Sequence, residues 1–413
     1  VVGFARFAFG LGASTNILDS LPWGWWKIFN MVAGAALATS GFVIAAVIYI
    51  LRLKRYYPVA RLSVLIGFLG YGSSLFALIF DIGLPHRGWH PFFMWNPHSF
   101  LFEVFWCVSI YWGVTALELL PILSERFPFP KVTHFLHEIM LPFVVLGVTL
   151  STMHHSSLGS LFLASPTRLH PLWHSMWIPP EFFVSAMGAG VAVLVLFLLV
   201  LSYLYRTRPD MRLLSRLASI SGALLTLYLG IKIADFTVHD KWRYVLGPDL
   251  TWESRLFWVE ITLQTIVPIA IFAPPALRRR RAALALGSTA ALLGLVMHRV
   301  DTGIVGYFRT SEAIYIPNLA ELVLSFGILA AAGLVFFFLI ERFPVMQGAG
   351  FCAEGERDPE AHEPVPVWTW AEARELFLGP GARRVGMLAL VVVPATWIGL
   401  RGQGTSAFEP VRA

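Results

Sequence analysis

The stretch Val148-Thr149-Leu150-Ser151-Thr152-Met153-His154-His155-Ser156-Ser157-Leu158-Gly159-Ser160 decides how this chain is interpreted. It closes an apolar segment that begins near residue 136, and it sets two adjacent histidines where a membrane helix is expected to leave the bilayer. Two other apolar segments carry single carboxylates, Asp81 and Glu103. Ionisable groups are costly in spanning helices, so their presence indicates a functional site.

Composition identifies the class of protein. Of 413 residues, 57% are hydrophobic and 14% are charged, whereas a soluble domain has about 25% charged residues. The chain is therefore expected to be an integral membrane protein, and its net charge of +6 comes from arginine-rich loops and does not indicate nucleic acid. Cys107 and Cys352 are too few for an iron–sulfur cluster or a structural zinc, which take about four ligands, so no metal site is predicted.

Apolar segments of spanning length recur along the whole chain. A spanning helix needs about 20 residues, so residues 1–12 are too short to cross the membrane. We expect an all-α membrane protein of nine to ten transmembrane helices, with a transmembrane domain at 1–345, a cytoplasmic loop at 346–384 and a possible extra helix and periplasmic tail at 385–413. The predicted spans are 28–51, 62–84, 100–121, 136–155, 181–205, 217–236, 256–273, 282–298, 319–340 and the shorter 385–400.

The basic residues of the loops predict the orientation. Alternate loops hold 19 Lys and Arg residues on one side and 11 on the other, and the richer side of a membrane protein is cytoplasmic. In a bacterial inner membrane, the location we expect, the other side faces the periplasm. Asp81, Glu103 and His154 then lie at the periplasmic ends of their helices, and Tyr71 lies about 15 Å deeper than Asp81 at 1.5 Å per residue.

These residues have the composition of a quinone site. A quinone carbonyl needs a hydrogen-bond donor, and its reduction needs titratable groups that deliver protons. The ring and tail need an apolar slot, which the aromatic loops 85–99 and 156–180 are expected to cover. We predict that His154 hydrogen-bonds or protonates a quinone carbonyl, and that Asp81 and Glu103 carry protons.

Each residue also has a simpler structural interpretation. His154 could be an interfacial hydrogen-bonded residue, and Asp81 could accept bonds from the loop that follows it or pair with Arg87. Glu103 could interact with the helix dipole, and Tyr71 alone is more typical of packing. The convergence of the four favours a shared site over these separate explanations.

Two other classes compete with a quinone protein. A haem b subunit needs two facing axial histidines, but His137 and His154 are about 26 Å apart on one predicted helix, and His298 could pair only with His154 or His155. A transporter of ions or small molecules would show interrupted helices with polar groups near the midplane, whereas here they gather near the periplasmic face. We therefore expect no haem or iron–sulfur cluster in this chain.

Further polar residues suggest a proton path. Arg61 and Glu118 lie near the cytoplasmic ends of their helices and are candidates for its start. In the second half, Asp235, Glu260, Arg299 and Glu321 are candidates, although buried charges also occur as structural salt bridges.

Several motifs give the chain a resemblance to a known family. It resembles the NrfD/polysulfide-reductase membrane subunits, and most closely the Hyb-type membrane subunits of periplasmic-facing NiFe hydrogenases. The matches run in order over roughly residues 5–345: Phe9-Gly10-Leu11-Gly12, Pro22-Trp23-Gly24, Tyr57-Pro58-Val59-Ala60-Arg61, Gly70-Tyr71, Ser99-Phe100-Leu101-Phe102-Glu103, Ala116-Leu117-Glu118, residues 152–161, His170-Pro171-Leu172-Trp173, Phe257-Trp258-Val259-Glu260, Arg299 and Glu321-Leu322.

The resemblance implies two four-helix bundles with additional helices, in a haem-free, quinone-reactive anchor subunit of a respiratory complex. It implies that menaquinone or ubiquinone is bound near Tyr71, Asp81, Glu103 and His154. Electrons would be exchanged with a periplasmic ferredoxin-like iron–sulfur subunit and a catalytic subunit, which is a NiFe hydrogenase, a molybdopterin enzyme or a multihaem cytochrome. Two features depart from the Hyb-type pattern: Leu198 replaces a carboxylate within the fifth span, and residues 351–413 are additional.

Overall fold

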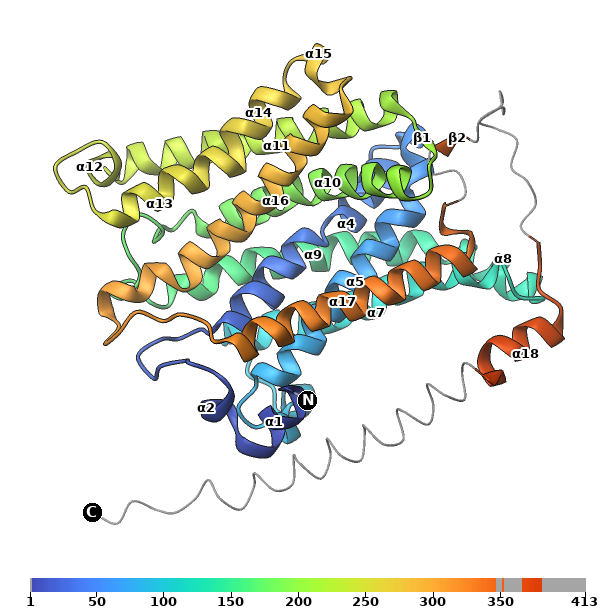
Figure 1. Cartoon of the computed structure of the whole chain (residues 1–413), viewed down its shortest axis with the longest axis horizontal. Helices are drawn as coiled ribbons and strands as arrows, with labels where there is room; N and C mark the ends of the chain where they lie inside the picture. Colours follow the sequence, from blue (N-terminus) through green and yellow to red (C-terminus); the bar gives the residue numbers. More distant parts are fainter. Residues whose placement is uncertain (1, 347–350, 353–365, 381–413) are drawn as a thin grey trace.

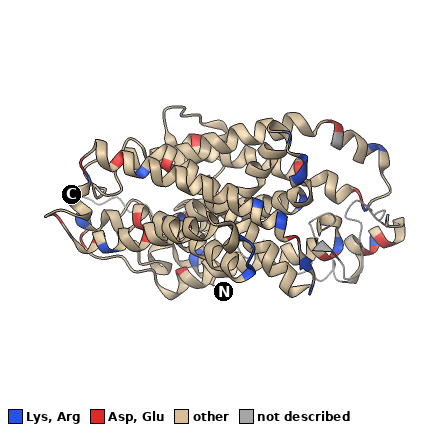
Figure 2. Ribbon diagram, turned by 90° about the horizontal axis from the view of Figure 1, so that it is seen from above, with Lys and Arg blue, Asp and Glu red and all other residues tan. Residues whose placement is uncertain are grey.

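The computed structural model describes residues 2–346, 351–352 and 366–380, and within them the chain is built of long helices that lie alongside one another (Figure 1). Eight helices are long and apolar enough to cross a membrane, and a bent pair makes a ninth. Most of the ribbon is free of charge, and Lys, Arg, Asp and Glu lie mainly toward the ends of the helices (Figure 2). The expected membrane class and its nine spans within these residues are confirmed, while the candidate span 385–400 lies outside them.

The first four spans form one bundle. The first span runs from Trp26 to Ile50 through the π-helical η1 (Trp26–Ala33), α3 (Gly34–Leu37), α4 (Ser40–Ala45) and η2 (Ala46–Ile50). It packs on α5 (Tyr57–Asp81), and α5 packs on α7 (Phe100–Ser124). The fourth member, α9 (Met140–Leu163), packs on α7 and α4 and closes the bundle.

The next four spans form a second bundle. It contains α10 (Ile178–Leu204), α11 (Met211–Val238), the composite of α13 (Trp252–Ile261), η5 (Thr262–Ile266) and α14 (Val267–Phe272), and α16 (Arg281–Gly303). α10 packs on α11 and α16, and α14 packs on both of these helices. The two bundles meet where α10 contacts α9, α3 and α4, and α17 (Leu319–Arg342) lies on α5 and η1 of the first bundle. The predicted pair of four-helix bundles with an additional helix is confirmed.

The histidine stretch lies inside its helix. The prediction that the span ends at residue 155 is wrong, because α9 continues to Leu163. Ser156, Ser157 and Ser160 each donate a hydrogen bond to the carbonyl four residues earlier, which satisfies their hydroxyls within the helix. Gly159 lets the backbone of α10 approach, since a Cβ there would lie 2.8 Å from the Cα of Pro179. The run of small residues is therefore a helix-packing surface.

Short segments join the bundle at both ends, which are called periplasmic and cytoplasmic after the orientation that the loop charges predict. On the periplasmic side, Arg6 of α1 (Val2–Phe9) donates to the carbonyls of Phe80 and Ile82 at 2.7 and 2.8 Å, so it caps the end of α5 with a cation, as the helix dipole favours. On the cytoplasmic side, β1 (Arg208–Pro209) pairs with β2 (Phe351–Cys352). Trp368, just before α18 (Trp370–Leu378), donates to the Arg126 carbonyl at 2.8 Å.

Candidate functional site

Three buried rings meet in the core of the first bundle. The Tyr71 hydroxyl of α5 lies 2.8 Å from Nε2 of His154 and 2.9 Å from Nε2 of His155, both on α9. None of the three side chains is more than 1% exposed. The structure therefore brings Tyr71 and His154 together, as the sequence predicts for one site, and it adds His155 to them.

The hydrogen bonds determine where the protons lie. Nδ1 of His154 is 2.8 Å from the Leu150 carbonyl, which only accepts, so this nitrogen carries the hydrogen. A neutral His154 then accepts at Nε2 from the Tyr71 hydroxyl, and the Tyr71 oxygen accepts from Nε2–H of His155. The three groups form a directed hydrogen-bonded chain of side chains that can each donate or accept a proton.

Tyr111 of α7 extends this cluster toward the cytoplasmic side. Its ring centroid is 4.6 Å from that of Tyr71 and 5.5 Å from that of His154. It is as buried as its two neighbours. Sequence reasoning missed Tyr111, although its position eight residues after Glu103 on one predicted helix was available as a signal.

A cavity of about 360 Å³ opens above the ring cluster at the periplasmic end. Its walls come from the first span, α5, α7 and α9, and residues His90, Pro91, Met94, Asn96 and Ser99 of the loop 85–99 cover it. Leu78 and Leu161 line the cavity, and each stands seven residues after a member of the ring cluster, Tyr71 or His154. Seven residues are two helical turns, about 10 Å, so the cluster lies directly beneath this cavity on the same helix faces.

The two predicted carboxylates lie higher than the histidines. Asp81 ends α5, about 15 Å above Tyr71, where it interacts electrostatically with Lys27 and Arg6. Glu103 is half-buried in the first turn of α7, between the cavity-lining residues Phe102 and Val104. The expectation of one common level is wrong because α9 extends two turns beyond the histidines. Asp81 and Glu103 do not line the cavity but adjoin the lining residues Ile82 and Phe102 in the chain, and Tyr71 and His154 lie below it.

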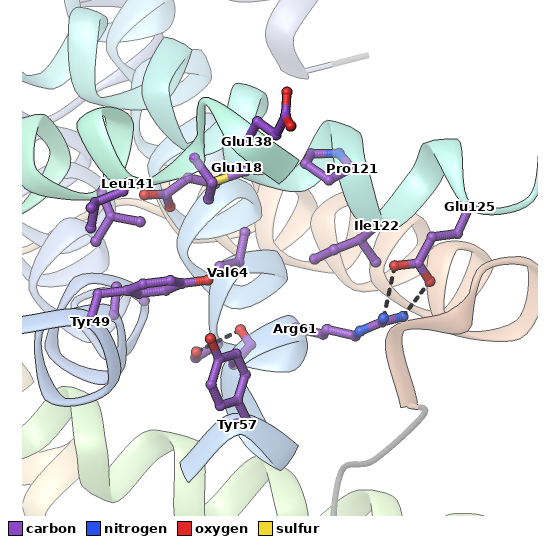
Figure 3. A pocket seen from close by; sticks show the side chains of 16 residues that line it. Tyr49, Tyr57, Arg61, Val64, Glu118, Pro121, Ile122, Glu125, Glu138 and Leu141 are labelled. Carbon is purple, nitrogen blue, oxygen red and sulfur yellow. Dashed lines mark hydrogen bonds and ion pairs between the residues drawn. The ribbon is translucent and has the colours of Figure 1, made fainter. Parts of the chain in front are cut away.

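A second cavity, of about 350 Å³, opens at the cytoplasmic end of the same bundle (Figure 3). Arg61 and Glu125 form a bidentate ion pair at its wall, with Nη1–Oε2 and Nη2–Oε1 distances of 2.7 and 2.8 Å. Arg61 also donates to the Pro344 carbonyl at 3.0 Å. Glu118 lines the same cavity and is 7% exposed, and Tyr49 and Tyr57 contribute two further hydroxyls to the lining. Both sequence-predicted residues, Arg61 and Glu118, thus lie at one cytoplasmic opening.

Gly147 of α9 stands between Glu118 and the ring cluster. A Cβ at this position would lie 3.4 Å from the Glu118 Oε1 atom and 3.4 Å from the Tyr111 ring. Glu118 and Tyr111 therefore border the same point on the α9 surface. Polar groups consequently follow one another from the cytoplasmic cavity through Glu118 and Tyr111 to Tyr71 and His154.

The second bundle buries its charged groups in pairs. Glu260 accepts from His298 Nδ1 at 2.8 Å and from Trp173 Nε1 at 2.9 Å. Lys232 pairs with Glu181 at 2.9 Å, which gives Glu181, the acidic residue at the start of the fifth span, a structural partner.

Asp235 and Arg299 have different kinds of partner, and Nε and Nη1 of Arg299 are buried without a hydrogen bond to any described residue. Asp235 pairs with Lys241 at 2.7 Å and with His239 at 2.8 Å, and it accepts from Ser175. Arg299 donates to the Phe182 carbonyl at 2.9 Å and lies over the Phe182 ring at 3.6 Å.

Glu321 holds the N-terminal segment in place. It accepts from the backbone of Asn16 at 2.6 Å and from the Tyr315 hydroxyl, and it forms a capping box with Asn318 at the start of α17. Burial and the hydrogen bond to Glu321 raise the pKa of the Tyr315 phenol, which keeps this hydroxyl a donor. The structure thus assigns Glu321 a set of capping contacts away from the ring cluster.

The histidines of the two bundle cores, His154, His155 and His298, already have other hydrogen-bond partners. His154 and His155 direct Nε2 at the same Tyr71 oxygen, and His298 directs Nδ1 at Glu260. A two-histidine haem needs imidazole nitrogens that face each other across the porphyrin, and His154, His155 and His298 are not arranged in this way. Within that same part, no three His, Cys, Asp or Glu residues gather as metal ligands.

The chain belongs to the polysulphide reductase, NrfD family, whose characteristic sequence it matches over residues 13–308. It is 30% identical to a probable Ni/Fe-hydrogenase 2 b-type cytochrome subunit of Escherichia coli, over 83% of this chain and 88% of that protein. It is 29% identical to the integral membrane subunit of a menaquinone reductase of Nitratidesulfovibrio vulgaris, over 81% and 86%. A selenate reductase subunit of Mesobacillus selenatarsenatis is 24% identical, over 82% and 90%.

Proposed function

We propose that this protein is the quinone-reactive membrane subunit of a respiratory oxidoreductase complex in the bacterial inner membrane. The observation that carries the proposal is the periplasmic cavity directly above the Tyr71–His154–His155 chain. The names of the relatives support it, since one is the membrane subunit of a menaquinone reductase and others belong to a hydrogenase and a selenate reductase. Family membership does not favour the transporter alternative.

The cavity has the lining that a quinone requires. Met31, Phe102 and Phe105 supply apolar surface on its walls, and ligand sites combine such surface with a few polar groups. A bound menaquinone or ubiquinone supplies two-electron chemistry that takes up or releases two protons. Asp81 and Glu103, beside residues that line the cavity, carry protons on the periplasmic side, and His154 exchanges a proton through the Tyr71 hydroxyl below.

The periplasmic surface supports docking of an electron-transfer partner. In the loop 85–99, Phe93 is 77% exposed and Trp95 is 68% exposed, and both lie outside the spanning helices. Aromatic residues are enriched at protein interfaces. The partner we propose is a ferredoxin-like iron–sulfur subunit that contacts the loops 85–99 and 156–180 and connects to a hydrogenase, molybdopterin or multihaem catalytic subunit.

The first bundle also supplies a route for protons from the cytoplasm. It begins at the cavity beside Arg61, continues through Glu118 and Tyr111, and reaches the Tyr71–His154 pair. Among the other proton-path candidates, Glu260, Asp235 and Arg299 form a separate set in the second bundle. Their ion pairs and hydrogen bonds, and the capping contacts of Glu321, support structural roles for these four residues.

Replacement of His154 by Ala tests the proposal. The complex would be purified through a tag on this chain, its subunits identified by mass spectrometry, and its electron transfer measured both to a quinone analogue and to a soluble dye. We expect His154→Ala to abolish quinone reactivity and to leave the composition of the complex and dye reduction intact. Normal quinone turnover in the variant would remove His154 from the site, and a wild-type complex that reacts with no quinone would refute the function itself.

A further inference from the structure

Lys27 is a cation at the wall of an otherwise uncharged cavity. It is the second residue of the first span, and its side chain lines the periplasmic cavity. Among the described residues that line this cavity, it is the only Lys, Arg, Asp or Glu. Most of the surrounding surface is apolar, with Met31, Leu78, Phe102 and Phe105 among its neighbours.

Its ammonium group differs from those of the other lysines held at the membrane helices. Lys232 and Lys241 each have a carboxylate oxygen within 2.9 Å. The Lys27 ammonium lies 5.2 Å from the centroid of the Trp23 ring and interacts electrostatically with Asp81. The Lys27 ammonium has three N–H donors, and it donates no hydrogen bond to any residue in the described part of the chain.

The half-buried Lys27 ammonium makes no hydrogen bond to the described residues, so its donors are available to a ligand in the adjacent cavity. Trp23 and Asp81 hold the ammonium in place but leave its donors free. The ligand that suits this arrangement has an apolar ring and a hydrogen-bond acceptor that becomes more negative on reduction. A 1,4-quinone headgroup has both features, since its carbonyl oxygens gain charge when electrons arrive.

We propose that the Lys27 ammonium donates a hydrogen bond to one carbonyl oxygen of the quinone headgroup in this cavity. This inference rests on the proposed function and adds the residue that fixes the orientation of the ring. Lys27 approaches from the first span, whereas Tyr71 and His154 lie on α5 and α9 beneath the cavity. The ammonium also favours ligands with negative charge on that oxygen.

The test compares two ring analogues that differ in charge. The neutral probe is 2-methyl-1,4-naphthoquinone, and the anionic probe is 2-hydroxy-1,4-naphthoquinone, whose hydroxyl is ionised at pH 7. Binding to the full chain in lipid nanodiscs is followed by quenching of tryptophan fluorescence. Loss of a charge-assisted hydrogen bond corresponds to about a tenfold or larger change in Kd. We therefore expect Lys27→Met to raise the Kd of the anionic probe by at least that factor and the Kd of the neutral probe by a smaller factor. Lys27→Arg should keep the wild-type affinity for both probes.

Controls separate binding from structure and from the function itself. Arg87 is an exposed cation of the loop 85–99 that does not line the cavity. The Arg87→Gln variant should therefore bind both probes with wild-type affinity. An unchanged preference for the anion in Lys27→Met would overturn the inference and leave the quinone site standing. If Lys27→Met loses affinity for both probes equally and melts at a lower temperature, Lys27 has a structural role and the inference is also overturned. A wild-type chain that binds neither probe would refute the proposed function.

Discussion

The two bundles bury their polar groups in opposite ways. The first bundle holds neutral hydrogen-bonding rings, Tyr71, Tyr111, His154 and His155, between a periplasmic and a cytoplasmic cavity. The second bundle holds more buried charged groups, and several of them form ion pairs, such as Glu181 with Lys232. The rings of the first bundle can exchange a proton without breaking an ion pair, whereas Glu181 and Lys232 cannot.

The difference shows why buried charge alone is a poor indicator of a reactive site. A buried ion pair contributes little net stability, yet removal of one partner is strongly destabilising. A chain of neutral rings can change protonation at small cost, because each proton that leaves is replaced by another. We therefore expect substitutions in the second bundle to affect stability and those in the first bundle to affect turnover.

The largest effect is expected when one member of the Glu181–Lys232 pair is removed. Lys232→Met leaves the Glu181 carboxylate unpaired where its side chain is 1% exposed, and breaking such a pair costs about 3–5 kcal/mol. Unfolding in denaturing detergent, followed by fluorescence, should show this loss. Addition of Glu181→Gln to the same chain should restore part of the stability, and a double variant as unstable as the single one would contradict the ion-pair explanation.

Matched removal of one hydroxyl in each bundle should separate turnover from packing. Tyr71→Phe removes the group that bridges His154 and His155, and proton-transfer groups contribute about 100-fold or more to rate. Quinone turnover of the complex should fall by about this factor.

Tyr228→Phe is the control for this experiment. The Tyr228 hydroxyl is fully buried and has no hydrogen-bond partner among the described residues, so its removal should leave stability unchanged or raised, and turnover unchanged. Equal losses of turnover in both variants would refute the assignment of the relay to the first bundle.

The sequence predicts the membrane helices well because spanning length and apolar composition are local properties. It misplaces the end of α9, because serine hydroxyls that bond within a helix look the same in sequence as those of a loop. The depth and the partners of His154 depend on the axial offset between α9 and α5, and no local sequence pattern predicts that offset. The role proposed for Lys27 could not be predicted either. Lysines are common at the ends of membrane helices, and the sequence does not show that a cavity lies beside this one.

The next effect concerns the cytoplasmic cavity. Glu118→Gln keeps the shape of the side chain but removes its ability to carry a proton. Proton uptake from the cytoplasmic side should fall about tenfold, which is less than the roughly 100-fold or larger contribution of groups that exchange a proton with the substrate itself. The measurement is the rate of pH change inside and outside vesicles that contain the oriented complex. Electron transfer to a soluble dye should be unaffected, and undiminished uptake in the variant would remove Glu118 from the path.

The smallest effect is expected at Gly147, and it tests whether the two halves of the path are connected. A methyl group there would contact Glu118 and the Tyr111 ring at 3.4 Å and Val114 at 3.3 Å, so Gly147→Ala must displace a side chain by a few tenths of an ångström. We expect about a twofold to threefold slower proton uptake, because small misplacements of proton-transfer groups reduce their rate. Gly113→Ala on α7 is the control, since nothing lies within 4 Å of a Cβ at that position. If both variants take up protons at the wild-type rate, Glu118 and Tyr111 are not consecutive steps of the path.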